Sequence, residues 1–240
     1  SHNIGFETRF ARIPIVPAAI LFDLGVGNAP DVRPTADCGL QAATIASAAP
    51  VNEGNVGAGA GATVGKLRGG SRAMKGGLGS AAVTMPNGLT VAALVAVNAV
   101  GDILDPTTGE IIAGVRTEDG QSLADARHLI RSGEISRLRQ AENTTIGVVA
   151  TNAVLTKSQA KKIAQMAHDG LARTIVPAHT PVDGDTIFSL ATGKLSGAPD
   201  ILTIGALAAE VMAEAVVRAV RQATSIPGYP AARDFDLSHP

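Results

Sequence analysis

The sequence predicts a layered α/β domain, in the α+β sense, in which sheets and helices pack closely. Apolar residues make up 45% of the 240 residues but aromatic residues only 2%, and there are 27 glycines. The core is therefore built from small side chains, which allow close backbone approach. A strand–turn–strand pattern surrounds Asn87-Gly88, and two amphipathic helical patterns follow apolar strands in the C-terminal half.

The charge and cysteine content exclude several classes of partner. The formal net charge is −1, from 20 basic and 21 acidic residues, which gives no electrostatic footprint for nucleic acid or an anionic membrane. Cys38 is the only cysteine, so the chain has no internal disulfide and no paired-cysteine metal or redox motif. No apolar stretch has the length and helical pattern of a membrane span. We therefore expect a cytoplasmic protein with a single domain, residues 1–240.

The first part of the chain combines an extended and a helical pattern. Residues 13–24 form an apolar run interrupted by Pro14 and Pro17, which is typical of an edge strand or an extended segment. Residues 37–49 are alanine-rich and stop before Pro50, which predicts a helix.

Residues 54–79 are unusually rich in glycine. A P-loop is excluded because Gly65-Lys66 is followed by Leu67, where Ser or Thr is required. Residues 57–62 only weakly imitate a dinucleotide-binding fingerprint, since no strand precedes their glycines. We expect instead that the glycines let the backbone pack closely around a site, with Lys66 as the charged group presented there.

The middle of the chain has the pattern of a β-hairpin. Apolar residues 81–85 and 89–98 flank an Asn-Gly pair, which is a strong hairpin signal. The second strand ends at Asn98. Most asparagines at such a position are turn residues, but a side-chain amide there can also donate to an oxyanion. Residues 111–115 predict a further strand, and the polar residues 120–143 predict a surface segment with a helix at 124–130.

The motif Asn143-Thr144-Thr145 stands where this segment enters a buried, β-branched strand at residues 146–151. It has three interpretations: ordinary turn chemistry, an Asn-X-Thr glycosylation site, which requires a secreted protein, and a self-cleaving bond. In the third, the Thr144 hydroxyl attacks the carbonyl of Asn143, and water releases Thr144 as a new N-terminus. Its α-amine, with a reference pKa of about 7.7–8.0, then acts as general base for its own hydroxyl.

Two helices are predicted in the C-terminal part. Thr156 and Gln159 form a capping box, and apolar residues then recur at helical spacing to about residue 173. A second apolar stripe predicts a helix over residues 204–223.

Asp183 and Asp185 lie between these helices, on either side of a glycine and before another apolar strand. A solvated turn is the commonest explanation of such a pair. A metal site that includes His179 is a second interpretation. In the third, the carboxylates orient and polarise a hydroxyl or amine nucleophile.

Four segments of the sequence together carry a family resemblance: NTTIGVVATNAVLTKSQ, HDGLARTIVPAHTPVDGDTIFSLATG, VAALVAVNAVGD and PIVPAAILFDLGVGN. They resemble the self-processing aminopeptidases of the L-aminopeptidase/D-Ala-esterase/amidase family, which includes β-aminopeptidases and nylon-oligomer hydrolases. The resemblance covers nearly the whole chain, and its most specific parts are the Asn-Thr-Thr and Asp-Gly-Asp-Thr segments.

The resemblance implies a four-layered αββα sandwich similar to N-terminal nucleophile hydrolases, with different strand connectivity. It implies self-cleavage between Asn143 and Thr144 into fragments 1–143 and 144–240, which stay together in a homo-oligomer, with a tetramer favoured. No metal or organic cofactor is required. The implied site consists of Thr144 as nucleophile, Asp183 and Asp185 as the groups that orient it, Asn98 as oxyanion donor, and Lys66 beside the nucleophile.

The sequence departs from this family in two places. Some relatives have tyrosine where this chain has Phe22, so a hydrogen bond from that position to the substrate is absent. Relatives also begin with a longer N-terminal segment, so the α fragment 1–143 is expected to lack that part.

The expected activity is hydrolysis at the N-terminal residue of small peptides, amides or esters, through an acyl-enzyme. Within the same chemistry, the substrate is alternatively an ω-amino-acid (nylon) oligomer. Acyl transfer to an amine, and binding of a small molecule without catalysis, stay open beside hydrolysis.

Overall fold

A four-stranded sheet forms the centre of the protein. The computed structural model describes residues 5–27, 30–136 and 143–235. The strand order is β11-β9-β6-β5, in which β5, β6 and β9 pair antiparallel and β11 lies parallel to β9. The strands are β5 (Gly77–Thr84), β6 (Thr90–Asn98), β9 (Thr144–Ala153) and β11 (Thr186–Leu195).

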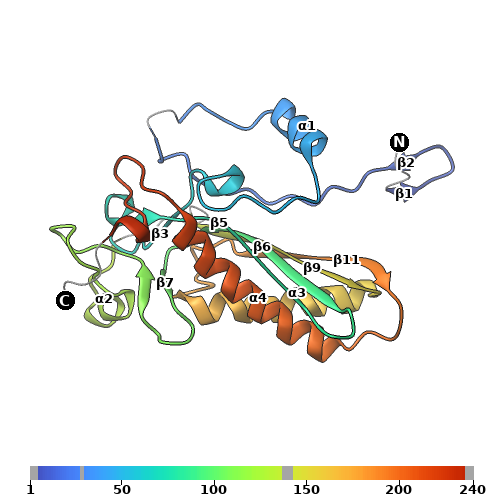
Figure 1. Ribbon diagram of the computed structural model, residues 1–240. Helices are drawn as coiled ribbons and strands as arrows, with labels where there is room; N and C mark the ends of the chain where they lie inside the picture. The colour runs from blue at the N-terminus through green and yellow to red at the C-terminus, as the bar shows by residue number, and fades with distance from the viewer. Residues whose placement is uncertain (1–4, 28–29, 137–142, 236–240) are drawn as a thin grey trace.

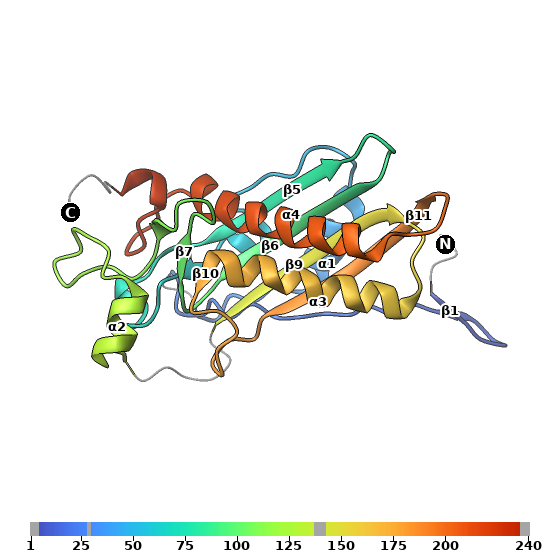
Figure 2. The same cartoon turned by 90° about the horizontal axis from the view of Figure 1, so that it is seen from below.

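Helices α3 (Lys157–Thr174) and α4 (Ile201–Gln222) lie side by side across one face of this sheet, as Figures 1 and 2 show. The predicted capping box is confirmed, because Thr156 Oγ1 accepts from the Gln159 N–H at 3.3 Å and Gln159 Oε1 accepts from the Thr156 N–H at 2.8 Å. The carboxylate of Asp200 caps α4, which begins three residues earlier than expected. Neither helix, nor any other in the described part of the chain, is long and apolar enough to span a membrane.

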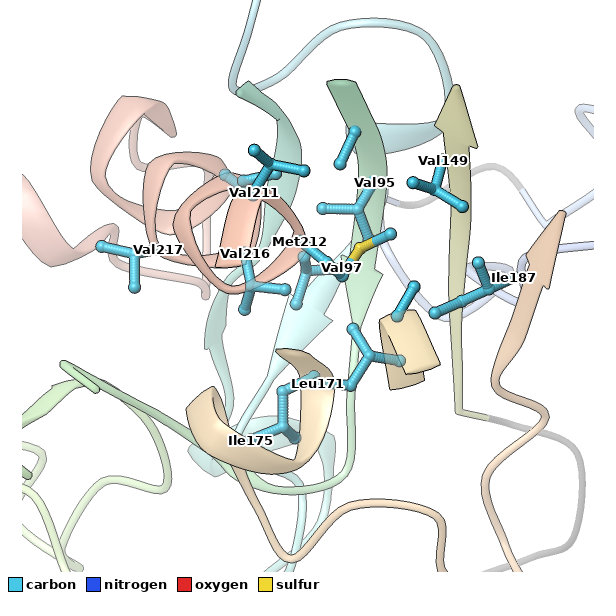
Figure 3. Packing of buried hydrophobic residues seen from close by; sticks show 14 of the residues in the cluster. Val95, Val97, Val149, Leu171, Ile175, Ile187, Val211, Met212, Val216 and Val217 are labelled. Carbon is cyan, nitrogen blue, oxygen red and sulfur yellow. The ribbon is translucent and has the colours of Figure 1, made fainter. Parts of the chain in front are cut away.

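The core lies between the sheet and the two helices and consists of small aliphatic side chains, as the composition predicts. Val95 and Val97 of β6 and Val149 of β9 point toward Met212 and Val216 of α4 (Figure 3). All five side chains are at most 1% exposed. The predicted hairpin is also confirmed, with Thr84 opposite Thr90.

Two glycines of the glycine-rich segment lie in a strand against α4. A Cβ on Gly77 would lie 2.3 Å from the Ala219 carbonyl oxygen, and one on Gly79 would lie 2.1 Å from that of Ala215. The strand begins four residues before the predicted residue 81, because strand and helix backbones touch here and only glycine fits. Close backbone approach was the expected use of these glycines, but the partner at these two positions is a helix.

The shorter elements extend this frame, and several differ from their predicted bounds. Only Arg12–Ile13 at the start of the run 13–24 is a strand (β2), because the two prolines keep the remainder out of a ladder. The helix predicted at 37–49 ends at residue 45, where Ala46 leaves the helical conformation. The remaining strands and α-helices of the described residues are β1 (Phe6–Glu7), α1 (Ala36–Ile45), β3 (Thr63–Val64), β4 (Met74–Lys75), β7 (Asp102–Leu104), β8 (Ile111–Ala113), α2 (Ala126–Ser132) and β10 (Ile175–Val176).

The sheet face opposite α3 and α4 lies toward the N-terminal residues 5–27 and 30–52 (Figure 1). Leu94, Val148 and Phe188 on this face are half-buried, and Leu190 is 54% exposed. The described residues thus form the sheet and the helical layer on its other face, within the expected α+β class.

Candidate active site

Thr144 and Asn98 lie opposite each other at one end of the sheet. Thr144 is the first residue of β9, Asn98 is the last of β6, and the two are partners in the antiparallel ladder. Ladder partners place their side chains on the same face of the sheet. Both residues are nearly buried, with 6% and 1% of their surface exposed. Two polar residues that the sequence places at separate strand ends are therefore brought together.

The carboxamide of Asn98 is fixed by contacts on both of its ends. Its Oδ1 accepts from Lys66 Nζ at 2.7 Å and from the Thr63 N–H at 3.0 Å, while its Nδ2 donates to the Phe22 carbonyl oxygen at 3.0 Å. An ammonium and a backbone N–H are donors only, so the orientation of the amide follows from its partners. Nδ2 carries a second hydrogen in addition to the one that it donates to Phe22.

Asp183 and Asp185 hold the backbone on the two sides of Thr144. Asn143 and Asp183 form a parallel bridge, and Asp185 Oδ1 accepts from the Thr145 N–H at 2.9 Å. Asp183 Oδ2 accepts from the Thr180 hydroxyl at 2.7 Å. Among the described residues, no hydrogen bond joins either carboxylate to Thr144 Oγ1. In this state the two aspartates position the main chain around the predicted nucleophile.

The glycine between the aspartates contacts the predicted scissile bond directly. The Gly184 N–H donates to the carbonyl oxygen of Asn143 at 2.8 Å. A Cβ built on Gly184 would lie 3.0 Å from Thr144 Oγ1 and 3.6 Å from the Asn143 carbonyl oxygen. The glycine therefore leaves the room that the Thr144 hydroxyl occupies.

Burial changes the pKa of Asp183. It raises the pKa of Asp183, and the like charge of Asp185 acts in the same direction, although the Thr180 hydroxyl lowers the pKa by hydrogen bonding. Burial also lowers the pKa of His168, whose ring stacks edge-on against His179 with 4.9 Å between centroids. Asp183 therefore takes up a proton more readily than an exposed aspartate.

The metal interpretation of His179 finds no support in the described part of the chain, where no group of three or more His, Cys, Asp or Glu side chains suits a metal ion. His179 Nδ1 lies 2.9 Å from Asp185 Oδ2, so the imidazole faces the carboxylate itself.

Phe22 reaches the site through its backbone carbonyl, and the residue is 37% exposed. The next residue, Asp23, lines a cavity of about 740 Å³ together with Gly61 and Tyr229. The expectation that the Phe22 side chain borders the substrate stays a prediction. Residues 137–142, which precede the predicted cleavage site, lie outside the described residues.

Sequence reasoning missed Thr63, Gly184 and Lys75. Thr63 acts through its backbone N–H, which leaves no signal in side-chain identity. Gly184 also leaves room for Thr144 Oγ1, but a glycine between two aspartates is equally typical of an ordinary turn. Lys75 is a fully buried lysine in the glycine-rich segment, and its burial follows only from the tertiary structure.

The chain is similar in sequence to proteins named as aminopeptidases and as nylon-oligomer hydrolases. It is 39% identical to an uncharacterized aminopeptidase of Mycobacterium tuberculosis, over 98% of this chain and 71% of that protein. It is 40% identical to one of Mycobacterium leprae, over 95% of this chain and 67% of that protein. A 6-aminohexanoate-oligomer endohydrolase of Kocuria sp. is 28% identical over 91% of this chain and 64% of that protein.

Two solved structures share the fold. The β-aminopeptidase of Burkholderia sp. has a TM-score of 0.52 and 26% identity, over 79% of this chain and 52% of that chain. The L-aminopeptidase D-Ala-esterase/amidase of Ochrobactrum anthropi, described as a variant of the Ntn hydrolase fold, has a TM-score of 0.52 and 22% identity, over 78% and 51%. This chain thus spans about half the length of these structures, and the likeness confirms the expected fold class.

The family assignment covers almost the entire chain. Residues 3–233 match Peptidase family S58, and this range includes every residue of the site described above. The chain therefore belongs to Peptidase family S58.

Proposed function

We propose that the protein is a self-cleaving amidohydrolase that uses Thr144 as its nucleophile and removes the N-terminal residue from small peptides, amides or esters. The observation that carries this proposal is the hydrogen bond from the Gly184 N–H to the Asn143 carbonyl oxygen, next to the Thr144 hydroxyl. A carbonyl that accepts such a bond is polarised toward attack, and the developing oxyanion has a donor already in place.

The self-cleavage step is an acyl shift from nitrogen to oxygen. Thr144 Oγ1 attacks the carbonyl carbon of Asn143, the peptide C–N bond breaks, and the proton of the hydroxyl passes to the nitrogen, which becomes the α-amine of Thr144. Water then hydrolyses the ester and releases the carboxylate of Asn143. The product is a free N-terminal threonine, which carries both the nucleophile and a base.

Turnover repeats this chemistry on the substrate. The α-amine of Thr144 takes the hydroxyl proton, Oγ1 attacks the substrate carbonyl, and the leaving amine receives the proton. The second hydrogen of Asn98 Nδ2 is the proposed oxyanion donor, and the position of Asn98 as the ladder partner of Thr144 supports this role. Water then hydrolyses the acyl-enzyme. No step needs a metal or an organic cofactor.

We further propose that fragments 1–143 and 144–240 stay together after cleavage, in a cytoplasmic homo-oligomer. The association of the fragments is supported by the position of β9 in the sheet, since it pairs with β6 of the first fragment along eight residues. Separation would break this ladder and expose the core beneath it.

A second candidate substrate class, the ω-amino-acid (nylon) oligomers, is supported by the 28% identity to the 6-aminohexanoate-oligomer endohydrolase of Kocuria sp..

The test measures the activity of the full-length gene product on α-aminoacyl amides, β-aminoacyl amides and 6-aminohexanoate oligomers, with hydroxylamine as an added acyl acceptor. Turnover of aminoacyl amides that is lost in Thr144→Ala and retained at a lower rate in Thr144→Ser supports the proposal. Preferential transfer to hydroxylamine over water favours the acyltransferase, and binding without turnover contradicts hydrolysis.

A further inference from the structure

Lys75 is a buried cation next to the site, and its hydrogen-bond partners are backbone carbonyl oxygens. Its side chain has 0% exposure, and its Nζ donates to the carbonyl oxygens of Gly59 at 2.7 Å, Ala62 at 2.8 Å and Gly76 at 3.0 Å. Three donors for three acceptors satisfy the ammonium, so it has no donor left for a substrate. Burial of the ammonium costs desolvation free energy that an apolar side chain at this position would not cost. A role of the charge itself would explain why a lysine stands here.

One of these carbonyls belongs to the peptide group that binds Asn98. Lys75 Nζ bonds to the C=O of Ala62, and the N–H of the same peptide unit, that of Thr63, donates to Asn98 Oδ1 at 3.0 Å. Lys75 and Thr63 are also ladder partners in β3 and β4. A cation on the carbonyl end of a peptide polarises its N–H end, and hydrogen bonds in a chain strengthen one another.

We propose that Lys75 is a positioning residue that fixes and polarises the carboxamide of Asn98 through the Ala62–Thr63 peptide, and so strengthens Asn98 Nδ2 as an oxyanion donor. Lys66 acts on the same Oδ1 directly, at 2.7 Å. Both ammonium groups thus draw electron density toward Oδ1 and leave the Nδ2 hydrogens more positive. This inference rests on the proposed function, since it concerns the oxyanion of that reaction.

The charge on Lys75 titrates within an accessible pH range. Burial lowers its pKa to about 8, and the carboxylate of Asp23 opposes that shift. The polarisation of Asn98 is therefore present at neutral pH and declines as the pH rises above about 8. The negative charge of Asp23 acts on Lys75. The Asp23 carboxyl lies against Gly61, between Gly59 and Ala62, whose carbonyl oxygens accept from Lys75.

The test compares Lys75→Met, Lys75→Arg and Asp23→Asn with wild type in the full-length protein. Each protein is checked for thermal unfolding and for the self-cleaved fraction by intact mass, and kcat and KM for an aminoacyl amide are measured from pH 6 to 10. Wild type is expected to lose kcat at alkaline pH. Lys75→Met should lower kcat roughly 10-fold with little change in KM, a part of the 10²–10³-fold loss that follows removal of a whole oxyanion donor.

The other two variants separate charge from packing. Lys75→Arg stays protonated throughout this range, so its alkaline loss of kcat should disappear. Asp23→Asn removes the carboxylate that supports the charge, so its alkaline loss should move to lower pH. Two results overturn the inference: a folded Lys75→Met variant with the kcat of wild type, or the same alkaline decrease of kcat in wild type, Lys75→Arg and Asp23→Asn. If Lys75→Met does not fold, the pH dependence of kcat in Lys75→Arg and Asp23→Asn decides. A wild type without self-cleavage or turnover instead overturns the proposed function.

Discussion

The amide N–H of Gly184 donates to the carbonyl oxygen of Asn143 at 2.8 Å, while the Cα of the same glycine faces Thr144 Oγ1. One residue without a side chain thus lies against both the carbonyl and the hydroxyl of the proposed self-cleavage step. This relationship explains why a glycine separates the two aspartates.

Replacement of Gly184 by alanine tests whether self-cleavage depends on the space that this glycine leaves for Thr144 Oγ1. The added methyl group would lie 3.0 Å from Thr144 Oγ1, so the hydroxyl must move by a few tenths of an ångström. We expect self-cleavage to slow about 10-fold or more, because small misplacements of a nucleophile cost large factors in rate. The time course is followed by intact mass. Gly70→Ala is the matched control, since its methyl meets only Tyr229 Oη at 3.8 Å. Equal rates in the two variants would contradict the account.

His179 is expected to hold Asp185 in place. Its backbone has a φ of 53°, a conformation that Asn and Asp tolerate best among residues other than glycine. His179→Asn keeps an N–H group near Asp185 Oδ2, whereas His179→Asp places a like charge there. We expect kcat for an aminoacyl amide to fall at least 10-fold further in His179→Asp than in His179→Asn, since removal of a donor or partner from a buried charge costs more than about 1.4 kcal/mol. Identical kcat values for the two variants, both folded, would show that the contact does not matter.

Asp102 is expected to make stability depend on pH between about 4 and 6. Burial raises the pKa of Asp102 to about 6, against two accepted hydrogen bonds from the N–H groups of Ala126 and Val115. In this window the folded protein holds a proton that the unfolded chain has lost, so the free energy of unfolding decreases as the pH rises, by up to about 3 kcal/mol. Urea unfolding at several pH values measures this slope, which should be absent in Asp102→Asn. An unchanged slope in that variant would assign it to other groups.

The close contact between β5 and α4 is expected to leave no room for a side chain at Gly79. In Gly79→Ala the methyl group would lie 2.1 Å from the Ala215 carbonyl oxygen, so the helix has to shift. We expect a loss of about 3 kcal/mol in the free energy of unfolding, as for overpacked cores. Gly39→Ala, whose methyl meets nothing within 4 Å, serves as control and should be neutral or slightly stabilising. A stable Gly79→Ala protein would contradict the close packing.

The features that depend on neighbouring residues could be predicted from the sequence. The Asn-Gly hairpin, the Thr156 capping box and the strand that ends at Asn98 all follow from local chemistry, and the structure contains each of them. Asn98 and Thr144 could each be picked out separately, since a polar residue at a strand end suggests a site.

The features that depend on distant segments could not be predicted. The register that makes Asn98 the partner of Thr144 is fixed by the packing of the whole sheet. Gly77 and Gly79 belong to β5 and pack against α4, which lies more than 120 residues later in the chain. The burial of Lys75 depends on carbonyl groups that the fold gathers around it.

The measurement that tests the central claim most directly is intact-mass spectrometry of the full-length gene product beside its Thr144→Ala and Thr144→Ser variants. The account predicts that wild type is cut after Asn143, with one product beginning at Thr144, that Thr144→Ser is cut more slowly or equally, and that Thr144→Ala stays whole. A wild type that stays whole in native buffer, or a Thr144→Ala variant that is cut at the same bond, would contradict Thr144 as the nucleophile of self-cleavage.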